Sequence, residues 1–367
     1  MPMPFISLHR TVLPGPCPRR RVVAAVLVAL LCGAVDTAFA AGPGSAASAG
    51  SCLETARQAR APSRALAMAA AARQEHNAFG GQTMDAEGRL LQAGDSEAED
   101  TRRTIGATPP WERVLGYWRA VDLQDTRLPY LVRFGALRPA HRELLLQALN
   151  QASADHLQGL GVGPDQGLAS SEQRATAVAL NRVAVIDTPW SAAFVSWLAR
   201  QAGLGADEFA FSEAHADYAG AAWQAGLDEA SGHATSYALR ACDPVQTPPR
   251  IGDLLCQARA GSAGIDSFAR IGEALVARRN GGAPLPMHCD VVVAVDATGF
   301  DTVGGNVLQS VTRRRLDFAA GTTLLDPSYQ PEGCASGSTG LSSTPIVPGC
   351  VDRHMSRQPW SLLLQWR

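Results

Sequence analysis

Residues 188–203 read TPWSAAFVSWLARQAG, and this stretch predicts the most clearly defined helix of the chain. The Thr188 hydroxyl can cap the first turn, and Pro189 suits the first helical position, where a missing N–H costs nothing. Gly203 is the expected end. The large apolar residues recur at spacings of four and of seven or eight: Trp190, Phe194 and Trp197 or Leu198. One face must therefore be buried, and Ser191 lies in the first turn beside unpaired backbone N–H groups.

The sequence after Arg250 changes to short apolar runs separated by turn residues, which is typical of strands. The expected strands are Ile251–Cys256, Asp290–Val295, Val307–Leu316, Thr322–Leu325 and Trp360–Trp366. Helices followed by strands predict an α+β fold, in which helices pack on an antiparallel β-sheet.

The sequence before this helix divides into three parts. Large apolar groups at helical spacing between Trp111 and Trp118 predict the first helix of the folded domain. We assign residues 101–367 to that domain, with a helical insertion at about residues 120–180. Residues 41–100 are rich in Ala, Gly, Ser, Gln and Arg and hold few large apolar side chains, so we expect a poorly packed leader.

The N-terminus has the pattern of a signal peptide. Basic residues 19–21 precede an apolar stretch, Val22–Val35, and the small-x-small triplet of residues 38–40. The apolar stretch has about 14 residues, whereas a bilayer-spanning helix needs about 20. We therefore predict that residues 1–40 are cleaved, that no transmembrane anchor remains, and that the protein is periplasmic or secreted.

The composition excludes several function classes. The formal net charge is -2, which provides no broad positive field for phosphates, so nucleic acid is not an expected partner. All 32 basic residues are arginine, which excludes a phosphate-binding loop with its lysine, a Schiff-base lysine and a Ser-Lys dyad. We expect no cofactor.

The mature chain holds an even number of cysteines: Cys52, Cys242, Cys256, Cys289, Cys334 and Cys350. In an oxidising compartment these predict disulfides, although the sequence cannot choose among the possible connectivities. Two pairs are favoured. Cys334 and Cys350 bracket a stretch rich in Gly, Ser and Pro, and Cys289 is suited to pair with Cys256 on a neighbouring strand.

Three motifs stand out: Pro189–Trp197, Gly252-Asp253-Leu254, and a run from His288-Cys289-Asp290 on to Gly304-Gly305-Asn306. Together, over roughly residues 111–366, they resemble the bacterial domain-of-unknown-function family 2272, which looks like a branch of the papain-like cell-wall hydrolases that include the NlpC and CHAP groups. The resemblance implies a papain-like fold. It also implies that a nucleophile opens a helix, a histidine begins a central strand and a polar residue orients that histidine. The corresponding positions are Ser191, His288 and Asn306, so serine stands in place of the nucleophilic cysteine.

This replacement changes the chemistry that the site requires. A serine hydroxyl is too weak an acid for a helix N-terminus alone to activate it, so Ser191 needs a base. His288 is the candidate, with Asn306 or Asp290 holding the ring's tautomer and first-turn N–H groups binding the oxyanion. Each residue also has a structural interpretation. Ser191 can satisfy its own helix, His288 can bond a carbonyl, and Asn306 suits a tight turn.

A second polar run follows the helix: Ser212, Glu213, His215, Asp217 and Tyr218. It can line a groove beside Ser191, which makes Trp190, His215 and Tyr218 candidate substrate-binding residues. A solvated turn and helix start is the favoured interpretation of this run. No metal site is expected, because His215 and Asp217 would diverge on a helix and no His-Glu-x-x-His motif exists.

Two functions remain. The first is an exported hydrolase, peptidase-like or amidase-like, that cleaves peptidoglycan amide bonds through a Ser-His-Asn/Asp site. The second is a non-catalytic module of the same fold that binds the cell wall or a protein. The motifs and export favour the first, and the missing cysteine favours the second. A serine hydrolase acting on esters is a weaker third idea, because the Gly-x-Ser-x-Gly elbow is absent.

Overall fold

The computed structural model describes residues 43–58, 60–100, 107–123, 186–259, 264–329, 355–356 and 358–367. The signal peptide, most of the expected insertion, Cys334 and Cys350 lie outside these residues. In the part of the chain that is described, no helix has both the length and the apolar character needed to cross a membrane.

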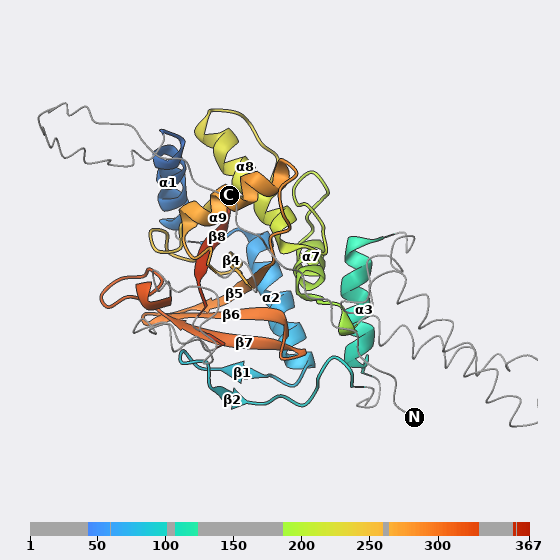
Figure 1. The fold of residues 1–367 in the computed structure, drawn as a ribbon. Helices are drawn as coiled ribbons and strands as arrows, with labels where there is room; N and C mark the ends of the chain where they lie inside the picture. The colour runs from blue at the N-terminus through green and yellow to red at the C-terminus, as the bar shows by residue number, and fades with distance from the viewer. Residues whose placement is uncertain are drawn as a thin grey trace, which may run out of the picture. The chain divides into compact units, whose positions relative to one another are not determined.

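The described residues form an α+β fold with six α-helices and an eight-stranded open sheet (Figure 1). The helices are α1 (Pro43–Ala56), α2 (Ser63–Ala78), α3 (Pro110–Val121), α7 (Ser191–Gln201), α8 (His215–Ala230) and α9 (Phe268–Arg279). The strands are β1 (Thr83–Met84), β2 (Leu90–Gln92), β3 (Leu239–Cys242), β4 (Leu254–Ala258), β5 (Met287–Val295), β6 (Gly299–Val307), β7 (Ser310–Asp317) and β8 (Trp360–Trp366), and a 3-10 turn, η2, spans Pro327–Tyr329.

The sheet has the order β2-β1-β7-β6-β5-β4-β8-β3. The expected antiparallel sheet is correct for all of its pairs but one, because β1 runs parallel to β7. The sheet is therefore mixed. β5 lies between β6 and β4, so the strand that carries His288 is central, as expected.

The main core lies between the helices and one face of the sheet. Cys289, Val291 and Val293 of β5 point into it, together with buried residues of α2, α3, α7 and α8. Val292, which alternates with them, belongs to a second, smaller cluster with Trp360. The two faces of β5 thus have different surroundings.

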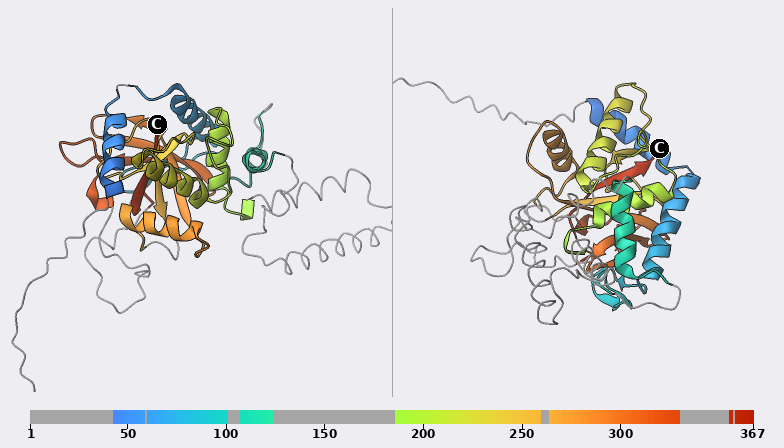
Figure 2. Two further views of the ribbon diagram at one scale, coloured as in Figure 1. Left: turned by 90° about the horizontal axis from the view of Figure 1, so that it is seen from above. Right: turned by 90° about the vertical axis from the view of Figure 1, so that its right-hand side faces the viewer.

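The tryptophan-rich helix behaves as its apolar face predicts. The α3 helix lies against α7 (Figure 2), where the Tyr117 ring packs 5.1 Å from Phe194 and 5.3 Å from Trp197 between centroids. Trp190 is fully buried against Phe79 and Tyr117. Gly203 follows the end of the helix with a positive φ of 76°, as expected.

The expectation that residues 41–100 pack poorly is wrong for α2. Ala65, Met68, Ala69 and Ala72 of this helix have no solvent exposure, because alanine lets a helix approach the sheet closely without large side chains. Its Glu75 forms a buried ion pair with Arg113, at 2.9 Å. Hence α3 is not the first packed helix.

Several element boundaries also differ from those predicted. The α7 helix begins at Ser191, with Trp190 as its N-cap and no side-chain cap, rather than at Thr188. Residues 304–307 belong to β6, so the next strand begins only at Ser310. The expected strand Thr322–Leu325 is reduced to an isolated bridge between Phe318 and Leu325. The sequence also gave no warning of β1, β2 and β3, whereas β8 matches its predicted bounds.

Two disulfides join elements of this fold. Cys256 and Cys289, predicted as a pair, are directly opposite each other on β4 and β5 and are bonded. A second bond joins Cys52 of α1 to Cys242 of β3. Disulfides of this kind are compatible with a protein located outside the cytoplasm.

Candidate active site

The candidate site forms where α7 and α8 begin. The Ser191 Oγ atom lies 2.7 Å from Nε2 of His215, the first residue of α8, within hydrogen-bond distance. Ser191 is 2% exposed and His215 is 4% exposed. The first helical N–H bond at this end of α7 runs from Phe194 to the Trp190 carbonyl, so the preceding N–H groups have no partner within the helix. Serine, imidazole and free backbone donors are thus close together.

Tyr218 completes a chain of three polar groups. Its hydroxyl forms a short hydrogen bond with Nδ1 of His215, one turn back along α8. If Nδ1–H donates to the Tyr218 oxygen, the free lone pair of Nε2 faces the Ser191 hydroxyl, as a general base requires. The opposite tautomer would instead donate from Nε2 to Ser191. Tyr218 therefore decides whether His215 can accept a proton from Ser191.

The surroundings of the Ser191–His215–Tyr218 hydrogen-bond chain favour the neutral forms of His215 and Tyr218. Burial lowers the pKa of His215 well below its usual value, and the neighbouring His288 and Arg259 lower it further. Burial likewise raises the pKa of Tyr218 well above 10, with smaller contributions from Tyr237, Asp290 and Asp217. Unlike a Ser-His-Asp triad, these three hydrogen-bonded side chains include no carboxylate that could stabilise a protonated His215.

His288 belongs to a neighbouring network on β5. Its Nε2 atom lies 2.8 Å from Oδ1 of Asp290, which confirms the expected contact between these two residues. Burial acts to raise the pKa of Asp290, but Arg314, His288 and Thr302 together hold it below its usual value. Asp290 is therefore ionised, and Nε2 of His288 lies within hydrogen-bond distance of both this carboxylate, at 2.8 Å, and Nη2 of Arg314, at 3.1 Å.

Arg314 neutralises this buried carboxylate. Its Nε atom lies 3.3 Å from Oδ2 of Asp290, and its guanidinium also donates to the Met355 carbonyl at 2.8 Å. The pKa of His288 is lowered, mainly by burial and further by Arg314 and Arg259, although Asp290 acts in the opposite direction. This network includes one complete ion pair, between Arg314 and Asp290, although the buried Arg314 Nε makes no hydrogen bond within the described residues.

The two networks meet at their histidines. The rings of His215 and His288 lie 5.4 Å apart between centroids, at an angle of 57°. No hydrogen bond joins Ser191 to His288 among the described residues, and His288 alternates with Cys289, which points into the main core. The structure therefore gives His215 the position beside Ser191 that the sequence assigned to His288.

The paired-glycine motif explains how the networks fit together. A Cβ atom on Gly304 would lie 1.9 Å from Oδ1 of Asp290 and 3.0 Å from Nε2 of His288. A Cβ atom on Gly305 would lie 2.7 Å from Cγ of Phe194, so α7 packs directly on this part of β6. Both positions need glycine for close approach.

Asn306 has the left-handed φ of 57° expected of a turn residue, and Leu308 and Gln309 share this conformation in the β6–β7 hairpin. The polar groups within hydrogen-bond distance of His288 belong to Asp290 and Arg314, whereas no bond to Asn306 occurs within the described residues. Trp190 is wholly enclosed in the aromatic core, which gives it a packing role. Of the three candidate substrate-binding residues, only His215 and Tyr218 contact the site.

Sequence reasoning named His215 but favoured a solvated helix start for its segment. The available signal was that His215 and Tyr218 are three residues apart and share a helix face, as both lie in the predicted helix start. Within the described ranges, no three His, Cys, Asp or Glu side chains form a cluster able to hold a metal ion.

Fold and site together define an α+β protein with a buried Ser-His-Tyr chain beside a helix N-terminus. Residues 158–366, more than half of the chain, match domain-of-unknown-function family 2272, which is described as uncharacterized protein conserved in bacteria, and the chain belongs to this family. Comparisons with curated proteins and with solved structures found no match.

Proposed function

We propose that this protein is an exported hydrolase with a papain-like fold that cleaves amide bonds in peptidoglycan peptides, with Ser191 as nucleophile and His215 as general base. The contact of 2.7 Å between Ser191 Oγ and His215 Nε2 at the start of α7 carries this proposal. The motif resemblance to the NlpC and CHAP hydrolases supports the substrate class. Two disulfides support export, because such bonds persist mainly outside the cytoplasm.

The reaction follows from the positions of these groups. His215 accepts the Ser191 proton at Nε2 as the oxygen attacks the carbonyl carbon, and the Tyr218 oxygen holds Nδ1–H in place. Backbone N–H groups in the first turn of α7 stabilise the oxyanion. His215 then returns the proton to the leaving amine, and water hydrolyses the acyl-enzyme by the same route.

The test combines a serine-directed fluorophosphonate probe with digestion of muropeptides. We expect wild type to be labelled and to release cleaved peptides, and S191A to do neither. H215Q should slow both reactions about 100-fold or more, as expected for loss of a general base. S196A is the matched control, because Ser196 is a buried serine of the same helix that donates to the Ser212 carbonyl. Equal labelling of wild type and S191A would refute the assignment.

A second function, a binding module without turnover, is favoured by the closure of the site. Ser191, His215 and Tyr218 are at most 4% exposed, and no carboxylate among the described residues bonds His215. On this alternative, purified protein binds muropeptides and neither cleaves them nor reacts with the probe. S191C separates the two cases, because a thiol is a far better nucleophile at this position. Cleavage by S191C alone would mean that wild type lacks only the thiol.

A further inference from the structure

Arg259 lies at the end of the sheet where His288 begins β5. It directly follows β4, and its backbone N–H donates to the Pro286 carbonyl at 3.0 Å. Two residues earlier, Gln257 is paired in register with His288. The backbone thus places Arg259 close to the strand that carries one of the two histidines.

The guanidinium of Arg259 is half-buried and uncompensated. Burial lowers its pKa, and it forms no ion pair or side-chain hydrogen bond with any residue that the structure describes. Other poorly exposed arginines are paired, for example Arg113 with Glu75, Arg240 with Glu229 and Arg314 with Asp290. A partly desolvated charge without a partner is unfavourable, so its presence next to the start of the strand that carries His288 points to an anionic ligand.

The charge of Arg259 acts on both histidines of the site. It lowers the pKa of His215, after the larger effects of burial and of His288. It also lowers the pKa of His288, where burial again dominates. An anion bound to Arg259 would remove part of this repulsion and so make His215 a stronger base while the ligand is present.

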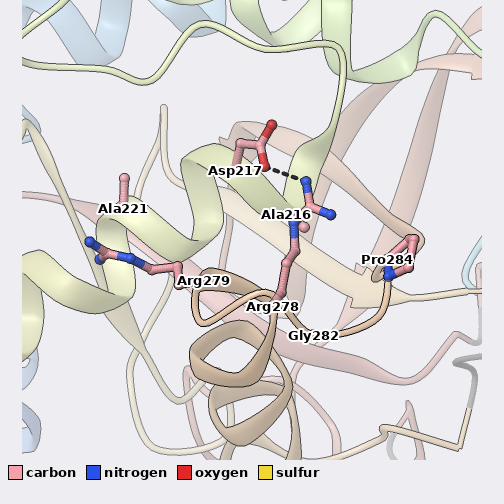
Figure 3. Close-up of a pocket in the computed structure, with 7 residues that line it drawn as sticks. All are labelled: Ala216, Asp217, Ala221, Arg278, Arg279, Gly282 and Pro284. Atoms are coloured by element: carbon pink, nitrogen blue, oxygen red, sulfur yellow. Dashed lines mark hydrogen bonds and ion pairs between the residues drawn. The ribbon is translucent and has the colours of Figure 1, made fainter.

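A cavity of about 480 Å³ lies between the start of α8 and the end of α9. Ala216 and Asp217, which line it, directly follow His215 along α8, and Pro284 lies just before Pro286. Arg278 and Arg279, from the end of α9, complete most of its wall (Figure 3).

The lining of this cavity is positive overall. Arg278 points to Asp217 and pairs with it, whereas Arg279 extends along the other side, past Ala221 (Figure 3). Asp217 also accepts a hydrogen bond from the Ser212 hydroxyl at 2.5 Å, so its carboxylate already has two partners, Arg278 and Ser212. The only side-chain bond of Arg279 within the described residues goes to Gln224, at 3.3 Å. The wall of this cavity thus holds one arginine, Arg279, that has no acidic partner among the described residues.

We propose that the substrate is a peptide with a free carboxylate, and that Arg259 binds this carboxylate beside Ser191 and His215. This inference rests on the proposed function, because it specifies the substrate class of the same site. Arg259 is then a specificity-determining residue, and Arg279 adds positive charge in the cavity at the start of α8. A glutamate side chain and a peptide C-terminus supply the same chemistry.

The test measures equilibrium binding to the mature S191A protein, so that turnover does not interfere. The probes are N-acetyl-Ala-Glu-Ala-amide, its isosteric N-acetyl-Ala-Gln-Ala-amide, and N-acetyl-Ala-Gln-Ala with a free C-terminus. Each probe is made with the central residue in the L and in the D configuration. We expect at least one carboxylate probe to bind about tenfold or more tightly than the amide probe, because charge-assisted bonds to arginine are strong. Which of the two does so identifies the source of the carboxylate.

Adding R259Q should abolish this preference, whereas R259K should retain part of it, because lysine keeps the charge but not the bidentate geometry. R270Q is the matched control, since Arg270 is an exposed arginine of α9 that pairs with Asp266. Equal binding of all probes, no binding of any, or an unchanged preference in R259Q would overturn the proposal. If the protein prefers carboxylate probes but wild type does not cleave muropeptides, only the proposed hydrolase activity would be refuted. If wild type cleaves muropeptides but no carboxylate probe is preferred, only the role of Arg259 would be refuted.

Discussion

The two disulfides allow a prediction of stability that can be calculated from chain connectivity. Cys52 and Cys242 are separated by 190 residues, whereas Cys256 and Cys289 are separated by 33. If a crosslink acts by restricting the unfolded chain, these closed loops correspond to about 5.3 and about 3.7 kcal/mol at 25 °C. All four cysteines are at most 1% exposed, so removing sulfur atoms should cost both pairs similar packing energy. C52A/C242A should therefore lose about 1.5 kcal/mol more than C256A/C289A.

Unfolding of the mature protein in urea, followed by circular dichroism and by tryptophan fluorescence, measures this difference. The two signals must change together for the free energy of unfolding to be defined. Each double variant serves as the control for the other. Our reasoning would be refuted if C256A/C289A were as destabilised as C52A/C242A, or more so. The β4–β5 bond would then act through native packing around His288 and Asp290.

Three further predictions concern single residues. The rate at which the probe labels Ser191 at pH 6.5 should be more than half of the rate at pH 8. An ordinary histidine would be half protonated at pH 6.5, but the pKa of His215 is lowered, so His215 should remain mostly neutral. A labelling rate that falls to half at or above pH 6.5 would contradict this. G305A should cost about 1–3 kcal/mol by overpacking against α7, measured by denaturant unfolding, whereas the control G116A, which has open space, should be neutral or stabilising. Burial raises the pKa of Asp253 to about 7, so carbon-detected NMR should show its carboxyl titrating with a midpoint near 7. Because the unfolded carboxyl titrates near 4, the contribution of Asp253 to stability should decrease as the pH rises from about 4 through 7. A titration midpoint near 4 in the folded protein would refute this prediction.

Strongly periodic segments were predicted well because their burial pattern is local. The apolar face of α7, the helix near Trp111 and the strand at Trp360–Trp366 all follow from residue spacing alone. The packing of α2 does not, because its buried face consists mainly of alanine, which is equally common on exposed helices. The short strands β1 and β2 pair with each other and join the sheet through the pairing of β1 with β7, a partner more than 200 residues away along the chain.

The site shows the same division. Alternation along a strand places Asp290 with His288 and turns Cys289 the other way, and the structure confirms the Asp290 contact and the disulfide. The partner of Ser191 could not be identified in this way. Both His215 and His288 were available, and the choice depends on how α8 approaches α7 across the core.

The sequence by itself determined the helix that presents Ser191, the strand that presents His288 and the likeness to family 2272, because each depends on neighbouring residues. Tertiary structure alone decided that His215 bonds Ser191, that Tyr218 rather than a carboxylate supports this histidine, and that Arg259 has no acidic partner within the described residues. Those contacts join residues on separate helices and strands. They are fixed by the packing of α7 and α8 on the sheet, with glycines at 304 and 305 permitting the close approach.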